Sequence, residues 1–159
     1  MILPYLDQPA LLERYDRSQP WDAPDNALVV NTVVPEYICP SVEGPLVRTN
    51  YVRVVGPGTI ADPDQIVSFG DITDGLSNTI LCVDWPDSEI RWAEPRDITV
   101  EEFLAWFRQP KHRRGHPFGI NVLFADGSVR FLPYSTPVET VRAMLTRNAG
   151  EAVSFDQLR

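Results

Sequence analysis

The stretch at residues 116–132, HPFGINVLFADGSVRFL, carries the strongest fold signal in the sequence. Two apolar runs flank Asp126-Gly127, a dipeptide typical of a two-residue β-hairpin turn in which both central residues take positive φ. Such a loop places four apolar side chains on one face of the hairpin, in the opposed pairs Phe124–Val129 and Val122–Phe131. The stretch therefore predicts an antiparallel hairpin with one buried face.

Outward from the hairpin, the sequence predicts further strands and several short helices. Apolar, β-branched runs that stop at proline or glycine predict strands at 36–40, within 49–58 and at 79–84. Capping boxes predict a helix on each side of the hairpin: Thr99 with Glu102, and Thr136 with Glu139 in a helix that stops at Gly150. Shorter helices are expected over 9–16 and, behind an Asp22 cap, before Pro35.

These elements predict an α+β protein in which short helices pack on an antiparallel sheet of four to six strands, with a C-terminal hairpin followed by a helix. A chain of 159 residues buries one ordinary core. We therefore expect a single globular domain at 1–150 and a C-terminal tail at 151–159.

The composition argues against several classes of function. Twenty-two acidic residues against fourteen basic ones give a formal charge of −8, which disfavours a surface that tracks nucleic-acid phosphates. No apolar run approaches the roughly 18 residues of a membrane span, and no signal-peptide pattern occurs. Cys39 and Cys82 form no Cys-x-x-Cys motif. They can form one disulfide or remain reduced, and the tendency of free cysteine to be buried favours the reduced state.

His116 is the residue that most suggests a reactive site, yet the sequence offers it no catalytic partners. A hydrolase triad would recruit Asp126 and a serine such as Ser128, but no Gly-x-Ser-x-Gly elbow occurs and the turn accounts for Asp126. We therefore predict no catalytic residues and a protein that is not an enzyme. His116 is expected to fix the loop that enters the strand at 121, by hydrogen bonding through either ring nitrogen.

Two groups of residues raise the question of a metal, and neither predicts one. His112 and His116 have the spacing of two ligands on a helix, but Gly115 and Pro117 oppose a helix and two intervening arginines disfavour a cation. A second group, Asp71, Asp74 and Asn78, offers oxygen ligands, but its residues do not follow the sequence order of a calcium-binding EF-hand loop. No metal or cofactor is predicted, and the basic run at 111–114 is expected to be a solvated loop.

The tryptophans are expected mainly to pack the core and its rim, because aromatic side chains bury large areas. Three of them are also candidates for stacking on a ligand: Trp21, Trp85 and Trp92. A ligand-binding module, for a carbohydrate for example, would combine these side chains with the Gly- and Pro-rich loop at 56–71.

Six motifs in order resemble a large bacterial family of prepilin-like proteins of unknown function: ILPYLDQPALLERYDRSQPWDAPDN, YICPS, NYVRVVGPGT, DITDGLSNTI, WAEPRDI and HPFGINVLFADGSVRFL. The C-terminal signature of that family is a histidine, nine residues, then Asp-Gly, a spacing matched by His116 and Asp126-Gly127. The resemblance spans residues 2–150. It carries over these motif residues without an assigned reaction: Cys39, Pro40, Asp74, Gly75, Ser77, Asn78, His116, Asp126 and Gly127.

The resemblance implies a pilin-like head domain of the kind found in type IV pilins and in the pseudopilins of type II (general) secretion. Such proteins are held outside the cytoplasm by an N-terminal leader and an apolar anchor helix, and their partners are other proteins of the assembly. Because this sequence starts at the ILPYL motif, we expect the leader and anchor helix to be missing from it. The expected function is non-enzymatic assembly or surface contact, which predicts an apolar groove where a helix packs.

Overall fold

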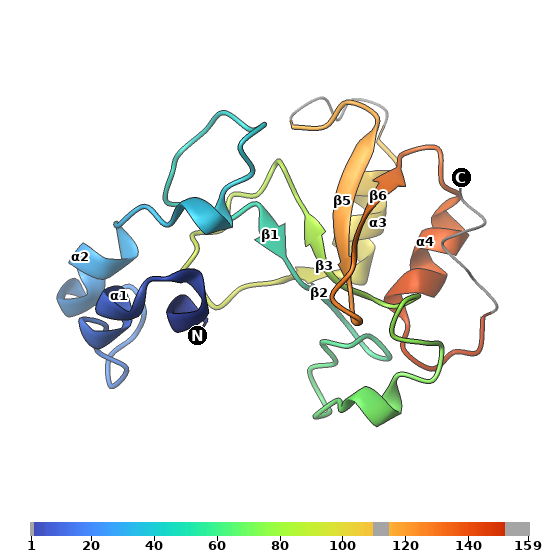
Figure 1. Cartoon of the computed structure of the whole chain (residues 1–159), viewed down its shortest axis with the longest axis horizontal. Helices are drawn as coiled ribbons and strands as arrows, with labels where there is room; N and C mark the ends of the chain where they lie inside the picture. The colour runs from blue at the N-terminus through green and yellow to red at the C-terminus, as the bar shows by residue number, and fades with distance from the viewer. Residues whose placement is uncertain (1, 110–114, 152–159) are drawn as a thin grey trace.

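A four-stranded antiparallel sheet, in the order β1–β3–β5–β6, forms the centre of the structure (Figure 1). The structure is a computed structural model that describes residues 2–109 and 115–151. The strands of the sheet are β1 (Tyr51–Val52), β3 (Ile80–Asp84), β5 (Gly119–Phe124) and β6 (Val129–Pro133). A separate parallel pair is formed by β2 (Val54–Val55) and β4 (Ile98–Thr99). The predicted α+β class and antiparallel sheet are confirmed, as is the strand at 79–84.

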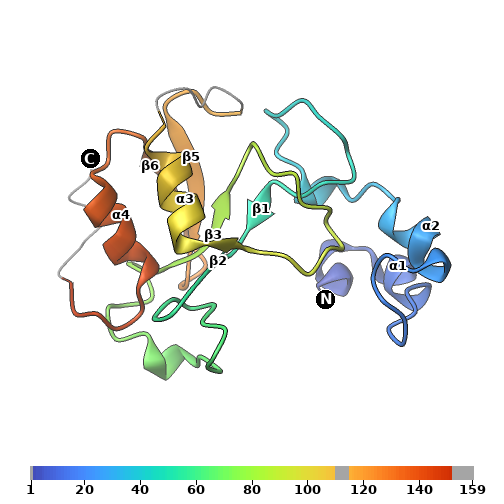
Figure 2. The ribbon, with the colours of Figure 1, turned by 180° about the vertical axis from the view of Figure 1, so that it is seen from behind.

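Two amphipathic helices, α3 (Val100–Phe107) and α4 (Val138–Leu145), cover one face of the sheet, which we call the inner face. Figure 2 shows α3 lying in front of the sheet, with α4 beside it. Fully buried side chains from both layers form the main core, among them Phe103, Ile120, Phe124, Leu132 and Val141. The predicted capping box of α3 is confirmed, because the backbone amide of Glu102 donates to Thr99 Oγ1 at 3.2 Å and the Thr99 amide donates to the Glu102 carboxylate at 2.7 Å.

The predicted capping box of α4 is wrong. Pro137 occupies the N-cap position without a side-chain hydrogen bond, and the helix ends at Leu145 rather than before Gly150. The chain leaves the helix early because Thr146 forms a β-bridge with Thr59 and the Arg147 amide donates to the Gly58 carbonyl at 2.9 Å. A tertiary contact with the 56–71 loop thus overrides the local helix signal.

The hairpin is present, but its predicted register is wrong by one residue. Leu123 faces Val129 and Val122 faces Arg130, so the loop contains three residues rather than two. The Gly127 amide donates to the Phe124 carbonyl at 3.0 Å, and Gly127 alone takes a left-handed conformation with φ +84. The Asp-Gly dipeptide is compatible with a type I turn followed by a left-handed glycine as well as with the predicted two-residue turn. Consequently Val122 is buried on the inner face, and Val129 lies on the opposite, outer face.

Short helices form a second, smaller core at the N-terminal end. These elements are η1 (Leu3–Leu6), α1 (Pro9–Glu13), η2 (Pro24–Asn26), α2 (Ala27–Val30) and η3 (Pro35–Tyr37), with a further turn, η4 (Phe69–Asp71), in the 56–71 loop. Leu3, Leu11, Val29 and Val34 are buried together there. Figures 1 and 2 place α1 and α2 at the opposite end of the molecule from α4. The helix expected at 9–16 is confirmed in a shorter form.

Two local predictions for this N-terminal end are wrong. Asp22 caps no helix, since Ala23 precedes η2 without a side-chain cap and the buried Asn26 side chain closes the loop onto the backbone of Asp16. The segment 36–40 is no strand, because Pro35 starts a 3-10 turn and the Cys39 amide donates to a side chain, Asn50 Oδ1, rather than to a neighbouring strand. Within the described residues, no helix has the length and apolar character needed to cross a membrane.

Candidate functional site

The outer face of the sheet, opposite to α3 and α4, holds the candidate site. Side chains alternate along β3 and β5, so Val83 and Val122 point to the core while their neighbours point outward. An apolar hollow of about 300 Å³ lies on this outer face. Its walls include Tyr51, Leu123 and Val129 from the sheet and Ile2, Leu6 and Tyr37 from the N-terminal turns.

Asp84, at the end of β3, is a buried carboxylate that also lines this hollow. Its side chain is 1% exposed, and neither oxygen has a hydrogen-bond partner of regular geometry among the described residues. Burial raises the pKa of the Asp84 carboxyl, and the nearby His116 and Cys39 side chains only partly oppose the shift. A buried carboxylate whose oxygens lack regular hydrogen bonds is costly to the stability of the fold.

Three polar side chains converge on one ring nitrogen, His116 Nε2. Asp84 Oδ2 lies 3.4 Å from it, Cys39 Sγ 3.6 Å and Asn121 Nδ2 3.2 Å. His116 is partly exposed, and the edge of its ring lies against Phe131. The site therefore joins the segment after η3, the end of β3 and both the entry and the interior of β5.

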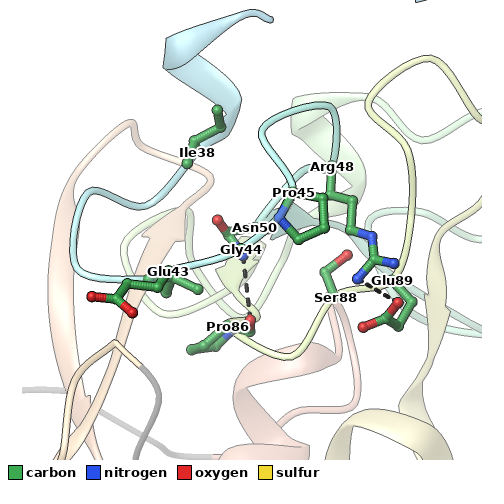
Figure 3. Close-up of a pocket in the computed structure, with 10 residues that line it drawn as sticks. Ile38, Glu43, Gly44, Pro45, Arg48, Asn50, Pro86, Ser88 and Glu89 are labelled. Carbon is green, nitrogen blue, oxygen red and sulfur yellow. Dashed lines mark hydrogen bonds and ion pairs between the residues drawn. The ribbon is translucent and has the colours of Figure 1, made fainter. Parts of the chain in front are cut away.

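Cys39 is held in this site through its backbone by Asn50. The Cys39 amide donates to Asn50 Oδ1 at 2.9 Å, and Asn50 Nδ2 donates to the Pro86 carbonyl at 3.4 Å (Figure 3). Asn50 is 7% exposed, so both hydrogen bonds are shielded from water. The lining of a small hollow of about 30 Å³ beside it includes Arg48 and Glu89, which form an ion pair (Figure 3). Asn50 thus ties the Cys39 segment to the turn that follows Asp84.

Gly115 sets the direction in which His116 enters the site. Its φ is +77, and a side chain there would lie 3.1 Å from Val42 and 3.3 Å from Pro86. Both neighbours belong to the segments that carry Cys39 and Asp84. A glycine is therefore needed at this position for backbone conformation and for space.

The geometry argues against a thiol nucleophile. In a Cys–His–acid relay the thiol and the carboxylate bond to different ring nitrogens, whereas here both approach Nε2. Burial, together with the nearby Asp84 charge, raises the pKa of the Cys39 thiol, which keeps it protonated. The arrangement instead resembles ligand atoms gathered around a point.

Asp126, the acid of the His116–Asp126-Gly127 motif, lies at the turn of the hairpin, whereas the imidazole lies at the start of β5. Its Oδ1 accepts hydrogen bonds from the Ser128 amide at 2.8 Å and the Ser128 hydroxyl at 2.6 Å. These bonds hold the pKa of Asp126 below its usual value. The acid that lies beside His116 is therefore Asp84 and not Asp126, which follows His116 by ten positions in the sequence.

The motif around Asp74 ties the turn before β3 to the C-terminal end of the described chain. Both Asp74 oxygens accept backbone amides, from Ala149 at 2.8 Å and Gly150 at 3.0 Å, and Asn78 Nδ2 donates to the Asp74 carbonyl. Gly75 has φ +100, Ser77 is half-buried, and Pro40 is exposed beside Cys39. Asp71 bonds Ser68 instead of joining Asp74, so the three oxygen donors considered for calcium do not form one cage.

The three candidate tryptophans do not line one hollow. The ring of Trp85 is stacked on that of Trp106, with their centroids 5.2 Å apart, and Trp85 packs against the main core. Trp21 and Trp92 instead line a second hollow of about 590 Å³, which shares Ile2 and Tyr37 with the first. In it the rings of Trp92 and Tyr37 are stacked, with their centroids 5.8 Å apart. The 56–71 loop contributes nothing to the walls of that hollow. His112 and the rest of the 111–114 run lie outside the described residues.

Sequence reasoning missed three residues of the site: Asn50, Asp84 and Asn121. The one signal available was an acid at the end of an apolar strand, ILCVD at 80–84, where a buried carboxylate needs a reason. Asn50 and Asn121 carry no such signal, because their roles depend on which segments the sheet brings together.

Residues 1–66 match a family described as a protein of unknown function (DUF1559). No curated protein and no solved structure matches the chain significantly. The matched part contains Cys39 and Asn50 and ends before Asp84 and His116. The first 66 of the 159 residues are thus similar to an uncharacterised family of bacterial proteins.

Proposed function

We propose that this chain is a non-enzymatic, pilin-like head domain that acts outside the cytoplasm, in an assembly related to type IV pili or type II secretion. In this proposal it binds an apolar helix of a neighbouring subunit on the outer face of its sheet. The observation that carries the proposal is the apolar hollow of about 300 Å³ on that face.

The surroundings of the hollow support a protein partner. Val129 is 64% exposed and Phe131 43% exposed on the same face, and Phe118 is 78% exposed nearby in the chain. Exposed apolar side chains beside an apolar hollow are typical of interaction sites. The resemblance of six motifs to those of prepilin-like proteins favours a helix as the occupant, because such proteins pack through an apolar N-terminal helix.

A non-enzymatic role is supported by the chemistry of the motif residues and their neighbours. Asp126 is engaged by Ser128, and the Cys39 and Asp84 groups approach the same nitrogen of His116. An acid–base relay needs those groups on separate nitrogens. The proposal therefore assigns the motif to architecture.

Photocrosslinking tests the helix-binding face. We expect a benzophenone amino acid at position 129, in the native bacterium, to crosslink to a protein that carries a prepilin-type apolar helix. The same probe at Glu139, an exposed position on α4, is the control and should give no adduct. Val129→Asp should weaken the association by about tenfold or more, because it buries a charge in the contact. Equal crosslinking at both positions, or none at either, would contradict the proposal.

A second candidate function is ligand binding in the aromatic hollow. Trp21, Tyr37 and Trp92 face one space of about 590 Å³, an arrangement suited to stacking on sugar rings. We expect Trp21→Ala to weaken binding of an oligosaccharide by about fivefold in calorimetric titrations. Val129→Asp is the matched control, since it lies outside this hollow. A panel of oligosaccharides that binds neither protein eliminates this candidate.

A further inference from the structure

The convergence of Cys39, Asp84 and His116 has a consequence that reaches beyond the proposed binding face. We propose that these three side chains bind a zinc ion, which fastens the N-terminal segment to the sheet. The three residues come from parts of the chain that only the fold brings together: the segment after η3, the end of β3 and the entry to β5.

The spacing of the ligand atoms fits tetrahedral zinc. Bonds of about 2.3 Å to sulfur, about 2.05 Å to nitrogen and about 2.1 Å to oxygen hold sulfur and nitrogen about 3.6 Å apart, and nitrogen and oxygen about 3.4 Å apart. The Cys39 Sγ–His116 Nε2 distance is 3.6 Å, and the Asp84 Oδ2–His116 Nε2 distance is 3.4 Å. All three ligand atoms lie within 4.8 Å of one another.

Hydrogen bonding alone does not satisfy this cluster. A ring nitrogen carries either one hydrogen or one lone pair, so Nε2 serves one partner at a time. Asp84, Cys39 and Asn121 all approach it. A metal ion accepts electron pairs from the imidazole, the thiolate and the carboxylate together, which resolves the competition.

The buried carboxylate is the second, independent sign of a ligand. Asp84 is 1% exposed, and both its oxygens lack hydrogen-bond partners of regular geometry among the described residues. A divalent cation would supply the missing charge, and it would deprotonate the Cys39 thiol that burial otherwise keeps neutral. Sulfur, imidazole and carboxylate together suit zinc better than magnesium or calcium, which prefer oxygen ligands alone.

Zinc at this point would fasten the two cores of the molecule. Cys39 follows η3, whose Tyr37 packs with the N-terminal cluster, while Asp84 and His116 belong to the main sheet. Three protein side chains leave one position of a tetrahedral zinc ion for water or another group, and the partly exposed His116 allows water to approach the cluster. The proposed role is structural, and it is independent of whether a helix binds the outer face.

Cobalt spectroscopy tests the ligand set on the untagged, chelator-treated full chain. We expect one Co²⁺ per chain, with the visible bands of tetrahedral cobalt and a thiolate-to-cobalt charge-transfer band. Cys39→Ser should abolish the charge-transfer band, and Asp84→Asn and His116→Ala should each weaken binding of Zn²⁺, measured by competition, by about a hundredfold or more. Cys82→Ser is the matched control and should keep the band, because Cys82 lies outside the cluster.

Thermal melting separates metal binding from folding. Zn²⁺ should raise the melting temperature of the wild-type chain and of Cys82→Ser, but not of Asp84→Asn. Without metal, Asp84→Asn should melt at the same temperature as wild type or higher, because it removes an unpartnered buried carboxylate. A cobalt spectrum that survives Cys39→Ser, binding without fixed stoichiometry, or a zinc-dependent rise retained by Asp84→Asn overturns the proposal. These outcomes test the zinc site alone, and the crosslinking at position 129 tests the helix-binding face separately.

Discussion

Gly119→Ala is expected to cause the largest loss of stability of any small substitution in the hairpin. A Cβ atom at this position would lie 2.2 Å from the Leu132 carbonyl oxygen and 2.8 Å from two ring atoms of Phe131. The clash is with backbone, so β5 and β6 must separate where Gly119 faces Pro133. We expect a loss of more than about 4 kcal/mol in the free energy of unfolding, measured by urea denaturation.

Gly127→Ala is the matched control for this prediction. Gly127 has φ +84, but a Cβ there would meet no atom within 4 Å. The substitution therefore costs only the left-handed conformation, about 1 kcal/mol. Equal losses for the two variants would contradict the structure of the hairpin. The comparison separates a glycine required by close packing from the motif glycine required by the turn.

Arg147→Met is expected to produce the second large effect, through the 56–71 loop. The guanidinium is 5% exposed and donates to the Thr59 carbonyl at 2.6 Å, to Asp62 Oδ2 at 3.0 Å and to Gln65 Oε1 at 2.9 Å. Its removal leaves a buried carboxylate unpaired. We expect the melting temperature to fall by about 10 °C, as measured by circular dichroism.

Arg142→Met provides the control, since Arg142 lies on α4 and pairs with Glu101 at the surface, where both side chains are exposed. Exposed ion pairs of this kind contribute little, so its melting temperature should change by no more than about 2 °C. A similar fall for both arginines would show that loss of positive charge, rather than the buried pair, sets the stability.

The Asp62 end of this pair should also make stability depend on pH. Amides of Gly58 and Asp64, followed by Arg147, hold the pKa of Asp62 below its usual value. The unfolded chain therefore binds this proton more readily, and the stabilisation is present above the unfolded pKa of about 3.9 and lost as the pH falls through the lower folded pKa. Asp62→Asn should melt below wild type at neutral pH, and the difference should shrink below about pH 4. A difference that is constant with pH would contradict this assignment.

Features that depend on neighbours in sequence were predictable. The capping box of α3 joins residues three positions apart, and the strand at 80–84 is an unbroken apolar run. The hairpin was found at its correct place, but the register was wrong because Asp-Gly suits both two- and three-residue loops. Because the observed loop is one residue longer than the predicted one, Val129 and Phe131 lie on the outer face and not in the core.

Local signals failed where distant segments compete for the same backbone. The Asp22 helix cap and the strand at 36–40 were wrong, because Asn26 and Asn50 side chains hold these segments through bonds to residues ten or more positions away. The stop of α4 was wrong for the same reason, since residues 146–147 pair with the 58–59 loop.

By itself, the sequence determined the α+β class, the hairpin and the helix that α3 forms, because each depends on residues close together in the chain. Only the tertiary structure decided the site. Cys39, Asp84 and His116 lie 45 and 32 positions apart, from 39 to 84 and from 84 to 116, and no local pattern links them. The pairing of β3 with β5, and the hydrogen bond from the Cys39 amide to Asn50, bring the three side chains together. These contacts depend on strand register and loop closure, which are decided by burial over the whole fold.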